Sequence, residues 1–135
     1  MRFMIIGKAT KESEAGILPK PEAFAAMGKY NDELVKAGVL LAAEGLAPSS
    51  KGARVRFSGD KRTVIDGPFA ETKEVVAGFT IIQVKSLEEA IDWVKRAPNI
   101  SSNGEAEVEI RKVMDLEDFG DAFTPNPEIA KIKIR

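Results

Sequence analysis

Residues 75–98 read VVAGFTIIQVKSLEEAIDWVKRAP and place a strand directly before a helix. The stretch from Val75 to Lys85 predicts a long strand, because apolar side chains alternate onto both of its faces. These side chains are Phe79 and Ile81 on one face, and Ile82 and Val84 on the other. A sheet built around this strand therefore needs a cover on each side.

The helix that follows is signalled by Ser86-x-x-Glu89, the pattern of a capping box. We expect the helix to begin there and to end before Pro98, which cannot continue it. Trp93 lies at the edge of the apolar stripe and is expected to pack rather than to bind a ligand. The stripe itself is predicted to hold Leu87, Ala90, Ile91, Val94 and Ala97.

The rest of the chain supplies the remaining elements of one α+β sheet. Strands are predicted over residues 2–8, 39–46 and 105–113, and a helix over 21–37 with the stripe Phe24, Met27, Leu34 and Val35. A hairpin is predicted to pair 54–57 with 62–65 around Ser58-Gly59-Asp60-Lys61. This order predicts a ferredoxin-like split βαβ sheet with an inserted β-hairpin.

Two helices can cover only one face of such a sheet, yet residues 2–8 and 75–85 carry apolar side chains on both faces. An uncovered second face would expose an apolar patch larger than a soluble monomer tolerates. We therefore predict a homodimer in which the same face of a second copy supplies the cover. Polar side chains and loops at the rim would then line a space between the two sheets.

The composition excludes several classes of site. The chain has 135 residues, enough for one domain, and contains neither cysteine nor histidine, which excludes thiolate nucleophiles, Cys or His zinc sites and histidine-based triads. No phosphate-binding glycine loop is present, so nucleotide chemistry has no support. Neither a metal nor a cofactor is expected. Twenty basic and 21 acidic side chains are interleaved, so no direct nucleic-acid partner is expected.

No apolar run reaches the length of about 18 residues that a membrane helix needs. The N-terminal MRFMIIGKAT is interrupted by Gly7 and Lys8 too soon to act as a secretory signal. The sequence therefore predicts a cytoplasmic protein without a membrane partner.

The stretch DGPFAETKE at residues 66–74 is either a turn or a site. Asp66-Gly67-Pro68 would break a strand anywhere, and the Asp66 carboxylate could simply accept hydrogen bonds within its own turn. As a site, Asp66 would be a catalytic proton acceptor, with Phe69 as an apolar wall and Thr72 and Lys73 as ligand-binding groups. Lys73 could equally belong to a solvated charge run with its acidic neighbours.

Two further polar residues interrupt apolar segments. Asn31 falls within the apolar stripe of the first helix, where its amide either satisfies a nearby backbone group or contacts a ligand. Glu44 lies in the apolar strand over residues 39–46, where burial would make it a second candidate catalytic proton acceptor. Alternatively, its side chain points outward at the strand end.

The residues YNDELVKAGVLL at 30–41, EGL at 44–46, DGPFAETKE at 66–74 and the helix SLEEAIDWVKRAP closely resemble the DGPF family of YCII-related bacterial proteins. The resemblance covers residues 1–113 as one domain and leaves 114–135 as a C-terminal appendage, which we expect to dock on the partner subunit. It implies a ferredoxin-like fold assembled as a dimeric α+β barrel.

The resemblance leaves the function open between two classes. Some members of the family resemble enzymes with a His-Asp pair in the inter-sheet cleft, and one branch is a dehydrochlorinase, but this chain has no histidine to supply that pair. The first hypothesis is a cofactor-independent enzyme that acts on a small organic molecule through carboxylate acid/base chemistry. The alternative is a non-catalytic ligand-sensing or protein-interaction module, which the family's association with sigma factors suggests.

Overall fold

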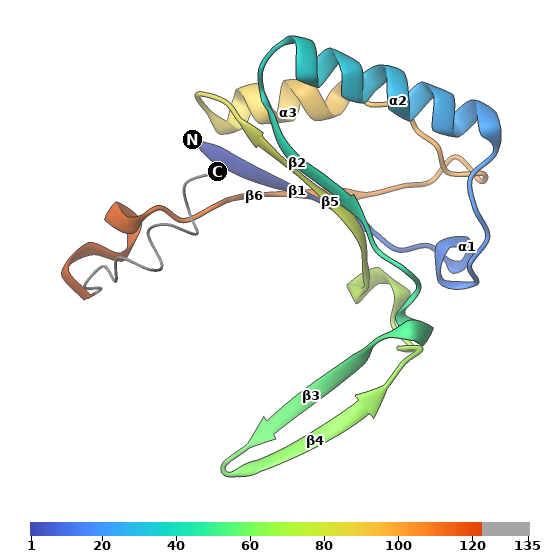
Figure 1. Cartoon of the computed structure of the whole chain (residues 1–135), viewed down its shortest axis with the longest axis vertical. Coiled ribbons are helices and arrows are strands. Elements are labelled where there is room, and N and C mark those ends of the chain that lie inside the picture. The colour runs from blue at the N-terminus through green and yellow to red at the C-terminus, as the bar shows by residue number, and fades with distance from the viewer. Residues whose placement is uncertain (123–135) are drawn as a thin grey trace.

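The computed structural model describes residues 1–122 and places a four-stranded antiparallel sheet beneath two helices (Figure 1). The strands stand in the order β2-β5-β1-β6, which confirms the ferredoxin-like order. They are β1 (Arg2–Lys8), β2 (Leu40–Gly45), β5 (Val76–Gln83) and β6 (Val108–Lys112), and the covering helices are α2 (Pro21–Lys36) and α3 (Leu87–Lys95). The final strand is shorter than the alternation over 105–113 predicts.

The core lies between the sheet and this helix layer. Phe3 of β1 pairs with Ile82 of β5, and both side chains pack against Leu34 of α2 and Ala90 of α3. The hydroxyl of Tyr30 on α2 donates a hydrogen bond of 2.6 Å to the carbonyl oxygen of Trp93 on α3. Trp93 therefore packs against the core, as expected, and its backbone joins the two helices.

The buried stripe of α2 differs from the predicted one. Leu34 is buried and Met27 is half-buried, but Phe24 and Val35 are 55% and 59% exposed. The side that packs on the sheet is centred on Leu34 and Tyr30, so Phe24 and Val35 lie on its flank. The prediction failed because this helix carries apolar side chains over a wider arc than the sheet covers.

Helix α3 begins at the predicted cap with one difference. The Ser86 hydroxyl accepts a hydrogen bond from the Glu89 N–H at 3.1 Å, but the Glu89 carboxylate accepts from the N–H of Lys85 rather than from that of Ser86. In the predicted stripe Ala90 is fully buried, Leu87 is 45% exposed, and Ala97 lies beyond the end of the helix. Leu87 occupies the first turn, where the sheet gives less cover.

A short helix, α1 (Lys11–Glu14), follows β1 and is not among the elements predicted from the sequence. Thr10 caps it: the Thr10 hydroxyl accepts from the Ser13 N–H, and the Ser13 hydroxyl accepts from the Thr10 N–H. A serine occupies the place that Glu or Gln takes in the usual capping pattern. The helix places Glu14 near the loop that follows β2.

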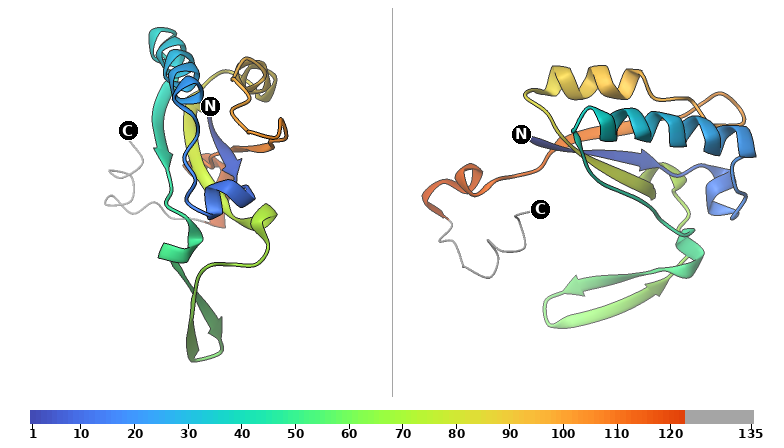
Figure 2. Two further views of the ribbon diagram at one scale, coloured as in Figure 1. Left: turned by 90° about the vertical axis from the view of Figure 1, so that its right-hand side faces the viewer. Right: turned by 45° about the horizontal axis from the view of Figure 1, so that its top comes forward.

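The inserted hairpin projects from the sheet as an arm (Figures 1 and 2). Its strands, β3 (Ala53–Ser58) and β4 (Lys61–Asp66), pair in the predicted register around Gly59 and Asp60. Every residue of β3 is exposed, and the apolar side chains on one face of the arm reach exposures of 50–68%. These side chains are Val55, Phe57 and Val64.

The second face of the sheet has no helix over it within residues 1–122. Since Phe3 and Ile82 point into the helix layer, alternation directs Met4, Ile6, Phe79 and Ile81 to the opposite face. We call these four residues the open face. All four are only half-buried.

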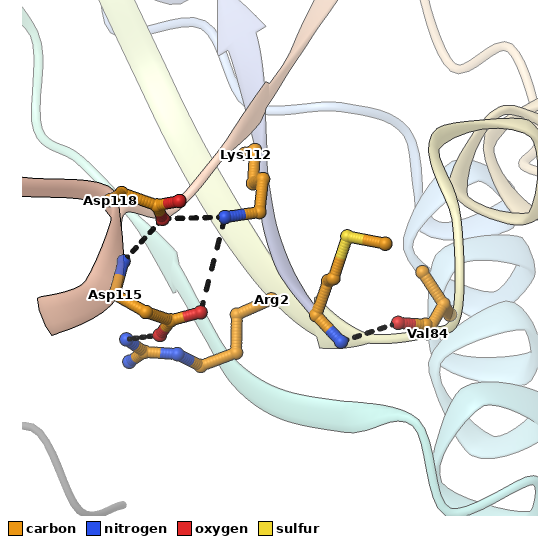
Figure 3. A network of polar contacts seen from close by, with 6 residues as sticks. Arg2, Val84, Lys112, Asp115 and Asp118 are labelled. Atoms are coloured by element: carbon orange, nitrogen blue, oxygen red, sulfur yellow. Dashed lines mark hydrogen bonds and ion pairs between the residues drawn. The ribbon is translucent and has the colours of Figure 1, made fainter. Parts of the chain in front are cut away.

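The chain beyond β6 is tied to β1 by a polar network (Figure 3). Arg2 pairs with Asp115 at 3.1 Å, and Lys112 pairs with Asp118 at 2.6 Å. The Asp118 carboxylate also accepts the Asp115 N–H at 2.8 Å, so these residues hold the start of η3 (Leu116–Ala122), a 3₁₀ segment. The remaining hydrophobic residues of the predicted appendage, from Phe123 on, lie outside the described residues.

Within residues 1–122, no helix combines the length and the apolar character that crossing a membrane requires.

Candidate functional site

Residues 66–69, which we call the DGPF loop, pack their backbone against the 3₁₀ turn η1 (Ser49–Lys51). Asp66 ends β4, and the Gly67–Pro68 peptide bond that follows is cis. The Gly67 N–H donates to the carbonyl oxygen of Gly52 at 3.1 Å, and the Phe69 N–H donates to the Ser49 hydroxyl oxygen at 3.1 Å. Two backbone donors of the loop are thus used to hold it in place.

Ser49 is itself held by α1. It is 8% exposed, its N–H donates to Oε1 of Glu14 at 2.9 Å, and its hydroxyl donates to Oε2 of the same carboxylate. The hydrogen bond from the Ser49 hydroxyl, followed by the one from its backbone, lowers the pKa of Glu14. An ionised carboxylate therefore connects α1 to the DGPF loop through one serine.

A hollow of about 370 Å³ opens beside this junction and has Phe69 in its wall. It lies where β2 ends and β5 begins, because these neighbouring strands are antiparallel. The Arg54 guanidinium carbon lies 3.8 Å from the centroid of the Phe69 ring. We call this space the Phe69 hollow; its wall contains Leu46, Ala47, Pro48, Ser49, Lys51, Gly52, Arg54, Phe69, Glu74, Val75 and Val76.

Of the residues predicted in the DGPF stretch, Phe69 lines the hollow and Asp66, Thr72 and Lys73 do not. Phe69 forms a wall of the hollow, as an apolar wall should. Asp66 and Lys73 are exposed, and within residues 1–122 neither side chain has a hydrogen-bond or ion-pair partner. Thr72 begins the 3₁₀ turn η2 (Thr72–Glu74), and its carbonyl oxygen accepts from the Val75 N–H at 3.0 Å.

Glu44 and Asn31 lie on opposite sides of the sheet. Glu44 of β2 pairs with Phe79 of β5, so its side chain is on the same side as the open face, and it is exposed. Asn31 is half-buried on α2, which packs on the other side. The structure therefore does not bring these two residues into one site.

No group of three or more Asp and Glu side chains lies close enough to hold a metal ion within the described part of the chain.

The family model for the YCII-related domain matches residues 1–116. The chain belongs to the YCII-related domain family. An uncharacterised protein of Rhizobium meliloti strain 1021 is 43% identical over 75 residues, which are 55% of this chain and 60% of that protein. The matched stretch thus spans less than two thirds of the length of that relative.

Among solved structures, this YCII-related chain resembles the 5-chloro-2-hydroxyhydroquinone dehydrochlorinase of Burkholderia phenoliruptrix AC1100 in complex with 2,5-dihydroxybenzoquinone. The TM-score is 0.46 and the sequence identity 16%, over 84% of this chain and 94% of the other. Likeness at this level does not transfer an activity.

Three residues that build the junction and the hollow were not singled out from the sequence. Glu14 lies 35 residues from Ser49, and Arg54 lies in the hairpin 15 residues before Phe69. Alternation along β3 would have predicted an exposed arginine but no contact with an aromatic ring. Arg54 meets Phe69 only because the base of the hairpin folds onto the DGPF loop, and Glu14 meets Ser49 only because α1 packs beside η1.

Proposed function

We propose that this YCII-related protein works as a face-to-face homodimer that encloses a small organic molecule between its two sheets. The observation that carries the proposal is the open face. Four large apolar side chains lie on a sheet face that no described helix covers, although uncovered apolar surface of this kind is costly in water. A second copy presents the same surface, as a two-fold dimer requires.

The charges around the open face are arranged to complement themselves. Glu44 stands on the edge strand β2. On the opposite edge strand, β6, the carboxylate of Glu109 is shared by Arg111 of the same strand and by Lys8 of the neighbouring strand β1. The β2 side of the sheet thus carries a negative charge, and this group on the β1–β6 side carries a net positive charge. A two-fold axis parallel to the strands would bring each edge over the opposite edge of the partner, so that unlike charges would meet.

The residues that would line the space between the two sheets indicate the chemical class of the ligand. The space between two such faces would have an apolar floor of Met4, Ile6, Phe79 and Ile81 and a carboxylate at its rim. Ligand sites combine a mostly apolar wall with a few polar groups that fix orientation. We therefore infer a small, largely apolar molecule with a hydroxyl group that donates a hydrogen bond to Glu44.

Glu44 also supports a second candidate function, acid/base catalysis on that molecule. It stands directly beside Phe79, so closure of a dimer would remove its water, and a desolvated carboxylate is a stronger proton acceptor. Glu44→Gln should then abolish turnover of the bound molecule while the dimer persists. Asp66 has less support, because it ends the projecting hairpin and is exposed.

Sedimentation velocity on paired variants tests the dimer. Ile6→Glu places a charge in the open face and should convert the dimer to a monomer, whereas Val35→Glu changes an exposed apolar residue of α2 and should not. In native mass spectrometry of the same samples, we expect a small molecule to co-purify with the wild-type dimer and to be absent from Ile6→Glu. A monomeric wild-type protein, or a dimer unaffected by Ile6→Glu, would contradict the proposal.

A further inference from the structure

The Phe69 hollow contains a cation that rests on an aromatic ring and has no anionic partner among residues 1–122. The Arg54 guanidinium lies against the Phe69 ring at 3.8 Å, a cation–π contact. Within residues 1–122 it forms no ion pair and donates no side-chain hydrogen bond. A planar guanidinium that rests on a ring keeps the N–H donors at its edge free, in the arrangement that matches a carboxylate.

The backbone that carries the Phe69 ring is held by hydrogen bonds. The Phe69 N–H donates a hydrogen bond to the Ser49 hydroxyl, and Ser49 in turn donates two hydrogen bonds to the Glu14 carboxylate. Fixing the groups of a site before a ligand arrives reduces the entropy that binding must overcome. The position of Phe69 is therefore set before a ligand arrives, and its ring offers Arg54 a surface to rest on.

The rest of the lining indicates the body of the ligand. Leu46 and Val76 are exposed apolar side chains, 50% and 36% exposed, on the wall of the same hollow. Lys51 adds a second cation, while Glu74 is an acidic side chain in the wall. The lining thus has a net positive charge of one, which suits a monovalent anion with an apolar body.

We propose that the Phe69 hollow binds a small organic carboxylate, with the carboxylate on the Arg54 guanidinium and the apolar body against Leu46 and Val76. The volume of about 370 Å³ is sufficient for a molecule the size of a substituted benzoate. The lining comes from a single chain. The site is therefore complete without a partner subunit.

Titration calorimetry with benzoate, and with benzyl alcohol as its neutral analogue, tests the site. Wild-type protein should bind benzoate saturably and benzyl alcohol about tenfold more weakly or not at all. Arg54→Gln should weaken benzoate binding by about tenfold or more. The matched control is Arg56→Gln, which removes a positive charge from the same face of β3 but has no ring contact, and it should change affinity by less than about twofold.

Two further variants distinguish an Arg54 site from general attraction to positive charge. Arg54→Lys keeps the charge but loses the planar donor set, so its affinity should lie between those of wild type and Arg54→Gln. Glu74→Gln removes the negative charge from the wall and should tighten binding. Equal losses in Arg54→Gln and Arg56→Gln, equal affinity for benzyl alcohol, or no saturable benzoate binding would each overturn the proposal.

The Ile6→Glu variant separates this inference from the proposed dimer. If it is a monomer that still binds benzoate, both proposals stand. If wild type is a monomer that binds benzoate through Arg54, the dimer proposal fails and the hollow stands; if wild type is a dimer without benzoate binding, the hollow fails and the dimer stands.

Discussion

Gly67 lies so close to the backbone of Ser49 that a Cβ at position 67 would overlap the Ser49 carbonyl oxygen. The contact joins the start of the DGPF loop to η1, and the hydrogen bond from the Gly67 N–H to Gly52 adds to it. Glycine is required here for close backbone approach, since its φ is not in the left-handed region. The glycine of the DGPF loop, Gly67, therefore has a packing role.

Gly67→Ala should destabilise the protein strongly. The new methyl group meets backbone atoms that cannot rotate away, so the loop must shift and lose its bonds to Gly52 and Ser49. We expect a cost of about 2–4 kcal/mol, measured as a fall in Tm of about 10 °C or more in thermal unfolding.

Gly28→Ala is the matched control, because Gly28 is an exposed helical residue of α2 and a Cβ there meets nothing within 4 Å. It should leave Tm unchanged or raise it, since alanine is the better helix former by about 1 kcal/mol. Equal losses in Gly67→Ala and Gly28→Ala would refute the packing role.

Glu14 should make stability depend on acid pH. Its hydrogen bonds from Ser49 hold its pKa below that of an unfolded glutamate, so the stabilising contribution is complete above the unfolded value and is lost as pH falls through the lower folded value. Glu14→Gln should lower Tm at about pH 7, and the difference from wild type should shrink as pH falls below about 4.

Glu105→Gln controls for the loss of one negative charge. Glu105 is exposed in the loop before β6, and its carboxylate has no partner within residues 1–122. The Tm of Glu105→Gln should therefore equal that of the wild-type protein at every pH. A Tm difference between wild type and Glu14→Gln that does not vary with pH would contradict the role of the ionised carboxylate.

Tyr30→Phe should loosen the helix layer. It removes the hydrogen bond to the Trp93 carbonyl oxygen that joins α2 to α3, at a cost of about 1–2 kcal/mol, which denaturant unfolding can measure. Burial raises the pKa of Tyr30, with Glu33 adding to the rise and Arg96 opposing it. The protonated form is thus favoured in the folded protein, and stability should fall as pH rises through the folded pKa.

Tyr30 is the only tyrosine of the chain, so phenolate absorbance reports on it directly. The folded protein should titrate at higher pH than the protein in concentrated urea. Identical titration curves in the two states would show that Tyr30 is not desolvated by folding.

Lys112 should hold the segment after β6 against the sheet. Its hydrogen bond to Asp118 is the main cause of its raised pKa, so its contribution is present below the pKa of an unfolded lysine and is lost as pH rises through the folded value. Because the group is exposed, Lys112→Gln should change Tm little. Hydrogen exchange at the Asp115 N–H should rise about two- to fivefold.

Lys36→Gln removes an exposed lysine from the last turn of α2, remote from this network in sequence, and should leave that exchange rate unchanged. Exchange that is equally fast in wild type and Lys112→Gln would show that the ion pair does not order the segment.

Much of the fold could be predicted from local patterns. Alternation and the Ser86 cap placed the long strand and the helix after it, and the hairpin register followed from its turn residues. The stripe of α2 was misplaced because periodicity identifies an apolar arc but not the part of it that the sheet covers. Phe24 and Val35 are the residues that this ambiguity affected.

The candidate site was much less predictable. Phe69 was recognised as a wall, but its partners Arg54 and Ser49 come from other segments. Asp66 and Glu44 stood out as carboxylates near turns or apolar runs. The structure places Asp66 at the base of the arm and Glu44 beside the open face.

The sequence by itself determined the order of the elements, the two apolar faces of β1 and β5 and the absence of histidine and cysteine, because composition and period are local properties of a chain. Only the tertiary structure decided that Gly67 serves close packing on Ser49, that Glu14 holds Ser49, and that Arg54 rests on Phe69. These contacts join residues 15 to 35 positions apart, and no local pattern encodes which surfaces meet when the chain closes.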